Sequence, residues 1–208
     1  MKSILLKFTL CLLVFTYACS SSQSTEATND SETPTETEAP AEDTKSEEAQ
    51  TSGENYTIKV LNADIPSPRK EMSGKIGGAD VVVTYGSPNV KGREVWGALV
   101  PYGQVWRTGA NEATSVSFSA DVKVEGQDLK AGKYGLFTIP GEDKWTIIFN
   151  TVADQWGGYS YDESKDVLRI EVAPKAAEEM GEGMDFIVDG DALVLHWEKL
   201  QVPIQVGG

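Results

Sequence analysis

Thr114-Ser115-Val116-Ser117-Phe118-Ser119 is the stretch that decides the fold class of this chain. Its apolar and polar residues alternate strictly, so Val116 and Phe118 share one face of an extended segment while the serines share the other. Further along, Glu125-Gly126 separates two short runs that also favour extended backbone. A turn pair of this type between two such runs is typical of a β-hairpin. The region therefore predicts an antiparallel sheet with one buried face.

The same pattern recurs from Tyr56 to the end of the chain. Short runs rich in Val, Ile, Phe and Trp are bounded by Gly, Pro, Asn and Asp, at a spacing typical of sandwiches and barrels. Helix-length periodicity is nearly absent, and the best candidates for a helical turn are residues 94–99 and 174–180. We expect an all-β domain, an antiparallel β-sandwich of jelly-roll type with about ten short strands and a long ordered loop. An antiparallel β-barrel is the alternative. The runs expected to form strands are 56–60, 79–85, 114–119, 122–124, 127–129, 134–139, 145–149, 167–172, 185–188, 192–198 and 201–206.

The first residues have the features of an export signal. Lys2 and Lys7 form a basic region before an apolar stretch over residues 8–15. This stretch is shorter than the roughly 20 residues that span a membrane. An alanine then precedes Cys19, which resembles the lipobox of bacterial lipoproteins, although Thr16 stands where an aliphatic residue is usual. We expect residues 1–18 to be a signal peptide and Cys19 to carry the lipid that anchors the chain to a membrane. Cleavage at the same bond by the ordinary signal peptidase, without lipid, is the alternative.

The segment that follows Cys19 differs in composition from the rest of the chain. Residues 20–55 contain no Val, Ile, Leu, Met or aromatic residue, and they carry ten Asp and Glu against one Lys. Such a segment cannot bury apolar surface and its like charges extend it, so we expect residues 19–55 to be a disordered acidic tether. Residues 56–208 carry 22 acidic and 15 basic side chains and no cysteine. This expected domain folds without disulfides, and its excess of acid argues against nucleic acid as a partner.

Residues 87–112 hold the densest group of unusual side chains. The stretch contains two tryptophans, two arginines and several glycines but little strand pattern. Long ordered loops in compact domains often carry function. Aromatic rings supply contact area, and Arg and Asn supply directed hydrogen bonds, so we expect a recognition surface here. Its candidate contact residues are Arg93, Tyr102, Trp106, Arg107, Asn111 and Glu112.

A purely structural role for this loop is the alternative. In that arrangement Trp96 and Trp106 fill the end of the core, and Arg107 forms an ion pair with Glu112. The two arrangements differ in whether the guanidinium is satisfied within the loop or is free to meet a ligand.

A second aromatic stretch is Gln155-Trp156-Gly157-Gly158-Tyr159-Ser160-Tyr161. Its rings lie between glycines, which favours a stacking platform for a sugar or a peptide, with Trp156 and Tyr159 as the contact residues. Alternatively the rings are tucked against the sandwich. The sequence does not place this loop next to the first one.

Several of these stretches resemble a bacterial family. Residues 90–114 and the run Leu129-Lys130-Ala131-Gly132-Lys133-Tyr134-Gly135-Leu136-Phe137-Thr138-Ile139-Pro140 closely resemble the uncharacterised family numbered 2911 among the domains of unknown function. The resemblance covers nearly all of residues 65–206, and Trp-Arg-Thr-Gly-Ala-Asn-Glu-Ala over residues 106–113 is its most specific part. It implies an exported, often lipid-anchored, all-β domain. It implies no activity, cofactor or catalytic residue, so no site is transferred.

These features predict a cell-envelope lipoprotein that faces the periplasm or the cell surface. Its domain is expected to bind a glycan, a peptide or another envelope protein. One alternative is an exported hydrolase acting on glycan or peptide with Glu112 as its acid or base, although no obvious second carboxylate accompanies it. A structural envelope protein is another alternative. No cofactor is expected, and no metal, because the domain has no Cys and His196 is its single His.

Overall fold

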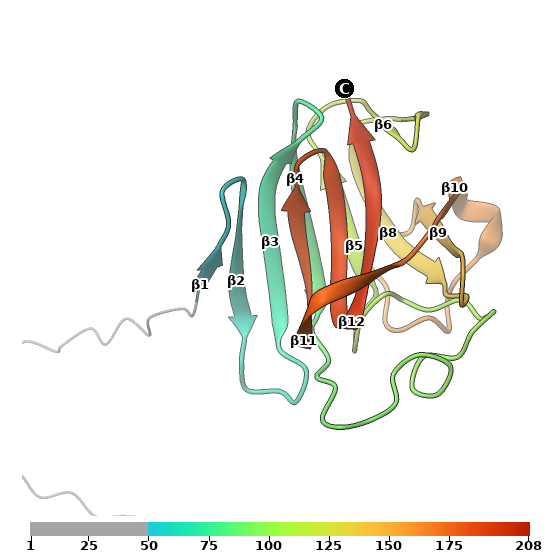
Figure 1. Cartoon of the computed structure of the whole chain (residues 1–208). Helices are drawn as coiled ribbons and strands as arrows, with labels where there is room; N and C mark the ends of the chain where they lie inside the picture. Colours follow the sequence, from blue (N-terminus) through green and yellow to red (C-terminus); the bar gives the residue numbers. More distant parts are fainter. Residues whose placement is uncertain (1–49) are drawn as a thin grey trace, which may run out of the picture. The chain divides into compact units, whose positions relative to one another are not determined.

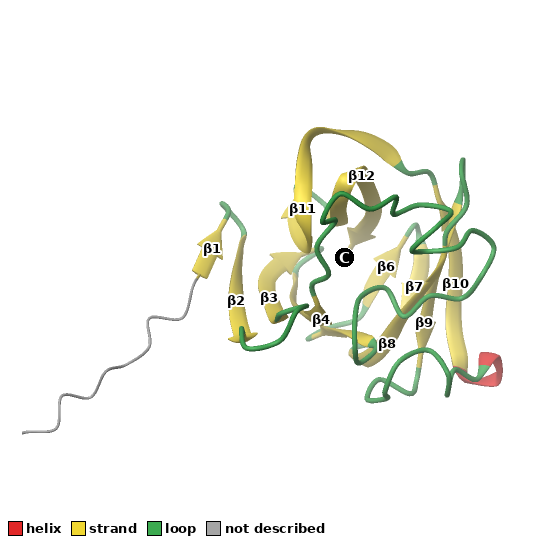
Figure 2. Cartoon of the chain, turned by 90° about the horizontal axis from the view of Figure 1, so that it is seen from below, coloured by secondary structure: helices red, strands yellow, loops and turns green. Residues whose placement is uncertain are grey.

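The computed structural model describes residues 50–208, in which twelve β-strands and one short 3-10 turn form the regular structure. The strands make two open antiparallel sheets that pack face to face as a β-sandwich (Figures 1 and 2). This confirms the all-β sandwich that the sequence predicts. In the large sheet the order is β1 (Gln50–Ser52), β2 (Tyr56–Asn62), β3 (Arg69–Ile76), β4 (Ala79–Gly86), β5 (Thr114–Phe118), β8 (Gly132–Ile139), β9 (Trp145–Asn150) and β10 (Asp166–Val172). The small sheet runs β11 (Lys175–Asp189), β12 (Ala192–Gly207), β6 (Val122–Val124) and β7 (Gln127–Leu129), and the 3-10 turn η1 is Glu163–Lys165.

The predicted hairpins are confirmed. Strands β6 and β7 pair across Glu125 and Gly126, whose φ angles of 48° and 78° are those of a turn with two left-handed residues. Strand β8 pairs with β9, and β11 pairs with β12 across Gly190. Each of these turns keeps the two strands antiparallel, so one face of each hairpin can meet the core.

Two strands were not predicted by the residue pattern. Strand β3 is largely polar, yet it pairs with β4 along its whole length and with β2 over residues 69–74, and it buries only Met72 and Ile76. Strand β1 lies within the expected tether, so the ordered domain begins before Tyr56. Its three residues are all exposed and pair with β2 through backbone hydrogen bonds, which need no apolar side chain.

The two expected helical turns are wrong. Residues 174–180 are mostly extended, because β11 starts at Lys175 and pairs with the middle of β12, with Ala176 opposite Leu200. This pairing joins the runs 192–198 and 201–206 into the single strand β12. Residues 94–99 form irregular turns within the loop that connects β4 to β5. In both places tertiary pairing decides the backbone against a weak local preference.

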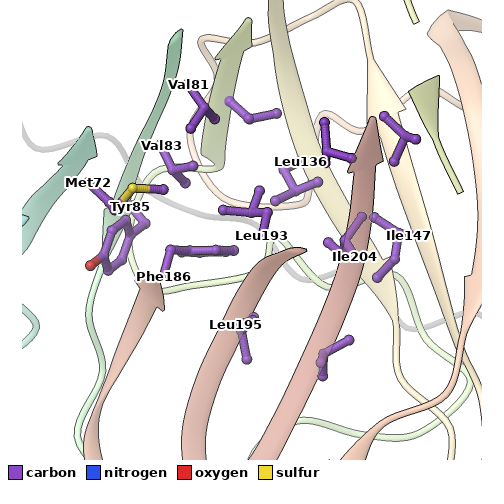
Figure 3. Packing of buried hydrophobic residues seen from close by; sticks show 14 of the residues in the cluster. Met72, Val81, Val83, Tyr85, Leu136, Ile147, Phe186, Leu193, Leu195 and Ile204 are labelled. Carbon is purple, nitrogen blue, oxygen red and sulfur yellow. The ribbon is translucent and has the colours of Figure 1, made fainter. Parts of the chain in front are cut away.

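The core lies between the inner faces of the two sheets (Figure 3). Met72, Val81, Val83 and Tyr85 project from β3 and β4 and are fully buried. From the small sheet, Phe186, Leu193, Leu195 and Ile204 meet them, while Leu136 and Ile147 continue the layer on β8 and β9. In strands such as β4, where every second residue faces inward, the alternation read from the sequence maps directly onto this layer.

Four tryptophans close one end of the core and form what we call the Trp cluster: Trp96, Trp106, Trp145 and Trp197. Trp96 meets the other three at centroid distances of 6.1, 5.0 and 5.5 Å in T-shaped geometry, and Trp106 stacks on Trp197 at 6.0 Å. In such T-shaped pairs the positive edge of one ring meets the negative face of the next. The expectation that Trp96 and Trp106 fill the end of the core is therefore confirmed.

Candidate functional site

The loop of residues 87–113 joins β4 to β5 at one end of the sandwich, at the bottom of Figure 1. Three buried valines, Val90, Val95 and Val100, hold it to the core at intervals of five residues. Between them the backbone amide of Val100 donates to the carbonyl of Val95 at 2.8 Å. The loop is therefore ordered by its own hydrogen bonds and by apolar side chains that it buries.

Backbone hydrogen bonds fix the second half of this loop to the ends of two strands. Trp106 and Thr138 of β8 exchange both backbone hydrogen bonds, at 2.7 and 2.9 Å. The amide of Ala110 donates to the carbonyl of Gly86 at the end of β4, at 3.1 Å. The hydroxyl of Thr114 donates to the carbonyl of Thr108 at 2.7 Å. These contacts hold residues 106–114 in one arrangement.

Two residues of this fixed segment have left-handed backbone conformations. Asn111 has φ 62°, which asparagine tolerates, but Thr108 has φ 56°, which is unfavourable for a β-branched residue. Thr108 is buried and its hydroxyl lies 3.2 Å from that of Thr138, so its surroundings enforce the strained conformation. Strain of this kind persists only where the structure over-determines it, and it clusters at functional sites.

The second aromatic stretch lies next to this segment. The amide of Ala113 donates to the carbonyl of Gln155 at 3.0 Å, and the amide of Gly157 donates to the carbonyl of Asn111 at 3.2 Å. Glu112 and Trp156 also face each other as an isolated antiparallel bridge. The structure thus brings together the two loops that the sequence could not place relative to each other.

The two loops border a cleft of about 640 Å³, within the size range of small-molecule sites. Five of the eight contact residues predicted from the sequence line it: Arg93, Trp106, Arg107, Asn111 and Tyr159. The remaining lining comes from small, apolar and polar residues, and it includes no Asp or Glu. These residues are Ser67, Pro88, Leu99, Val100, Pro101, Gln104, Val105, Gly109, Ala110, Gly158 and Trp197.

Three predicted contact residues lie outside the cleft. Tyr102 is partly exposed on the loop surface. Glu112 and Trp156 border a separate hollow of about 280 Å³, where Glu112 accepts a hydrogen bond from the guanidinium of Arg69 at 3.1 Å. The predicted ion pair between Arg107 and Glu112 is therefore wrong, because β3 supplies the partner of this carboxylate.

The tyrosines of the second loop have different surroundings. Tyr159 is 97% exposed and Trp156 is 66% exposed, so the expectation that these rings are tucked against the sandwich is wrong for both. Tyr161 does pack, with its ring 5.0 Å from that of Phe137, and its hydroxyl donates to Asp166 at 2.6 Å. Burial and this carboxylate raise the pKa of Tyr161 to about 12. Tyr161 therefore fixes the base of the loop, while Tyr159 projects at the mouth of the cleft.

Arg107 dominates the electrostatics of the cleft. Its Nε atom is buried and has no hydrogen-bond partner. Burial lowers the pKa of Arg107, while the nearby Tyr159 has the opposite, smaller effect. Within residues 50–208 no carboxylate pairs with this guanidinium. Because arginine stays protonated in proteins, the cleft holds a partly desolvated positive charge without a counter-ion from the described chain.

Sequence reasoning missed Trp197 and Ser67 as lining residues. Trp197 belongs to the apolar face of β12, and the strand alternation assigns it to the core, where 99% of it is indeed buried. Ser67 lies in the connection between β2 and β3, and its carbonyl lies 3.4 Å from the side-chain amide of Asn111. Neither residue carries a local signal for ligand contact, because only the packing of distant segments brings it to the cleft.

Comparison with protein families gives one match. Residues 67–206 match the family described as Protein of unknown function (DUF2911). The chain belongs to this family. The match spans β3 through β12 and therefore contains the cleft, both loops and the Trp cluster of the DUF2911 domain. No curated protein and no solved structure matches the chain.

Within residues 50–208, no three side chains of His, Cys, Asp or Glu are grouped so that they could hold a metal ion. The same residues contain no helix that is long and apolar enough to cross a membrane. The expected lipid on Cys19 and the signal peptide over 1–18 lie outside the described residues.

Proposed function

We propose that the DUF2911 domain is a ligand-binding module and that the cleft beside Arg107 is its binding site. The observation that carries this proposal is the unpaired guanidinium inside an aromatic-walled cleft. A structural ion pair would satisfy Arg107 within the fold, whereas here Glu112 pairs with Arg69 instead. Desolvating a charge without a partner is unfavourable, so a ligand that supplies the partner accounts for the arrangement.

The shape of the cleft supports a small ligand rather than a flat protein interface. Its volume of about 640 Å³ suits a sugar unit, a dipeptide or a molecule of similar size. Trp106 and Tyr159 offer ring surfaces, and Arg93, Asn111 and Gln104 offer polar groups. Ring surfaces beside directed polar groups are typical of sites that bind small molecules.

Filling the cleft tests this proposal. A side chain added at Gly158 meets no atom within 4 Å and its backbone has no positive φ, so Gly158→Phe is expected to fold and to occupy the cleft. Sugars, amino-acid derivatives and short peptides are screened by the shift in melting temperature of the full chain. A ligand of the cleft is expected to stabilise the wild type and to lose this effect in Gly158→Phe.

Gly207→Phe is the matched control, because Gly207 also has open space around it and does not line the cleft. It is expected to respond to ligand like the wild type. A ligand that stabilises Gly158→Phe as much as Gly207→Phe would bind elsewhere, and the cleft would not be the site.

We further propose that this module is held at the cell envelope by lipid on Cys19. The apolar stretch that precedes Cys19, the small residue before it and the acidic segment after it support this placement. The strand β1 at Gln50 then marks where the proposed tether meets the folded domain. A tether of about 30 residues would give the cleft a wide reach above the membrane surface.

Metabolic labelling tests the lipid. Cells that express the full chain are fed an alkyne-tagged fatty acid, and label on the protein is measured together with its share in the membrane fraction. Cys19→Ala is expected to lose the label, whereas Cys11→Ala, which changes the only other cysteine, is expected to keep it. Equal labelling of Cys19→Ala and the wild type would rule out this anchor.

A further inference from the structure

We infer that the cleft binds its ligand through a carboxylate group and that Arg107 holds this carboxylate. The inference rests on the proposed ligand-binding function and names the chemical class of the ligand. The lining of the cleft is its basis: two arginines and no Asp or Glu, in a domain whose residues 56–208 carry 22 acidic side chains against 15 basic ones. The cleft is therefore a local exception to the acidic character of the domain.

Arg107 differs from the other three arginines of residues 50–208 in what its guanidinium contacts. Arg69 and Arg169 form ion pairs with carboxylates. Arg93 donates to two backbone carbonyls. The buried Nε of Arg107 has no acceptor at all in this part of the chain. Nε itself is closed to solvent, so a carboxylate in the cleft would pair with the remaining N–H groups of this guanidinium, for which the described residues provide no carboxylate.

The charge of the site favours a carboxylate over a phosphate. One unpaired guanidinium neutralises one negative charge, and its planar fork matches the two oxygens of a carboxylate. A phosphate dianion would need a further free cation, but Arg93 is already held by the carbonyls of Asn89 and Val90. The surrounding acidic residues would also repel a dianion more strongly than a monoanion.

The backbone of Arg107 is held in place before any ligand arrives. Its carbonyl accepts a hydrogen bond from the amide of Thr114 at 3.1 Å, and its neighbours Trp106 and Thr108 are both fixed to Thr138. The backbone that carries this guanidinium therefore need not rearrange when a ligand binds, which favours affinity. The rings of Trp106 and Tyr159 would then contact the ring or apolar body to which the carboxylate is attached.

The test compares acids with neutral counterparts of the same shape. Binding of glucuronate and glucose, and of N-acetylphenylalanine and its amide, is measured by calorimetry on the full chain, with phenyl phosphate as the dianion. We expect at least one acid to bind more tightly than its neutral counterpart and than phenyl phosphate. Preferential binding of glucuronate would point to a sugar acid as the source of the carboxylate, and preferential binding of N-acetylphenylalanine would point to an amino acid or a peptide.

Variants of Arg107 connect this preference to one side chain. Arg107→Gln is expected to weaken binding of the acid by about 10- to 100-fold and to leave the neutral compound unchanged. Arg107→Lys keeps the charge but not the planar fork, so its affinity for the acid is expected to lie between those of the wild type and Arg107→Gln. Lys59→Gln removes one charge from an exposed position outside the cleft and is expected to bind like the wild type.

The possible results show separately whether the carboxylate inference fails and whether the proposed binding cleft fails. Equal affinity for acid and neutral compound, with binding still lost in Gly158→Phe, would overturn the carboxylate and leave the binding cleft. Unchanged affinity of Arg107→Gln for the acid would also overturn the role of Arg107. Tighter binding of phenyl phosphate would replace the carboxylate by a phosphate. Binding of none of the five compounds would overturn the carboxylate inference, whereas the binding cleft itself is decided by the wider screen against Gly158→Phe.

The folded state of Arg107→Gln provides a separate check. Because this substitution removes a partly desolvated charge without breaking an ion pair, its melting temperature is expected to equal or exceed that of the wild type. A large decrease would mean that Arg107 has a structural partner in the fold, and the inference would then be withdrawn.

Discussion

Trp145→Ala is expected to lower the free energy of unfolding by about 3–5 kcal/mol, which corresponds to a decrease of roughly 10 °C in the melting temperature. The ring of Trp145 is 99% buried and packs against those of Trp96 and Trp106, at centroid distances of 5.0 and 6.3 Å. Its removal leaves a cavity that the fixed β9 strand cannot close. Thermal and denaturant unfolding of the full chain, followed by circular dichroism, measure the change.

Trp156→Ala makes the same deletion at a ring that is 66% exposed. Its free energy of unfolding is expected to stay within about 0.5 kcal/mol of the wild type, since little packing is lost there. Equal losses for the two variants, or no loss for Trp145→Ala, would show that the Trp cluster does not stabilise the sandwich.

The Trp cluster also determines which residue can report on binding. Trp106 lines the cleft, but it is also part of the cluster and stacks on Trp197 at 6.0 Å. Truncating it would disturb the core and the cleft together, so a loss of ligand could not be separated from a loss of packing. Arg107 has no such double role, because its guanidinium has no partner in the described chain. It is therefore the better probe of the cleft.

Much of the fold follows from local features of the sequence. The strict alternation over residues 114–118 becomes β5, with Val116 and Phe118 buried, and Glu125-Gly126 becomes the turn between β6 and β7. Strand β3 has no such pattern. Its residues are extended because β2 and β4 supply hydrogen-bond partners on both sides, and that information lies in the tertiary structure.

The candidate site was predictable in its residue types but not in its pairings. Three of the predicted residues, Arg107, Asn111 and Tyr159, are of types that often contact ligands, and they lie in stretches with little strand pattern. All three line the cleft. The partner of Glu112 was not predictable. Nearness in sequence favoured Arg107, but Glu112 instead pairs with Arg69, which comes from a strand 43 residues away in the sequence.

Gly86→Ala is expected to lower the free energy of unfolding by about 2–4 kcal/mol and to damage the cleft at the same time. A Cβ atom at this position would lie 2.1 Å from the carbonyl oxygen of Ala110, a backbone atom that no side-chain rotation can move away. Gly86 is paired with Arg69 across β3 and β4, so the sheet holds it in place and the loop must shift instead. That shift breaks the hydrogen bond from the amide of Ala110 to the carbonyl of Gly86.

The same movement carries the binding site with it, because Ala110 and its two neighbours, Gly109 and Asn111, all line the cleft. Any compound found to bind there is therefore expected to lose affinity for Gly86→Ala even at temperatures where the variant is folded. Gly207→Ala is the control: its added Cβ meets nothing within 4 Å, and both its stability and its affinity are expected to match the wild type. If Gly86→Ala and Gly207→Ala behave alike, the loop is free to move away from β4. The fixed geometry on which the preorganisation of Arg107 depends would then be absent.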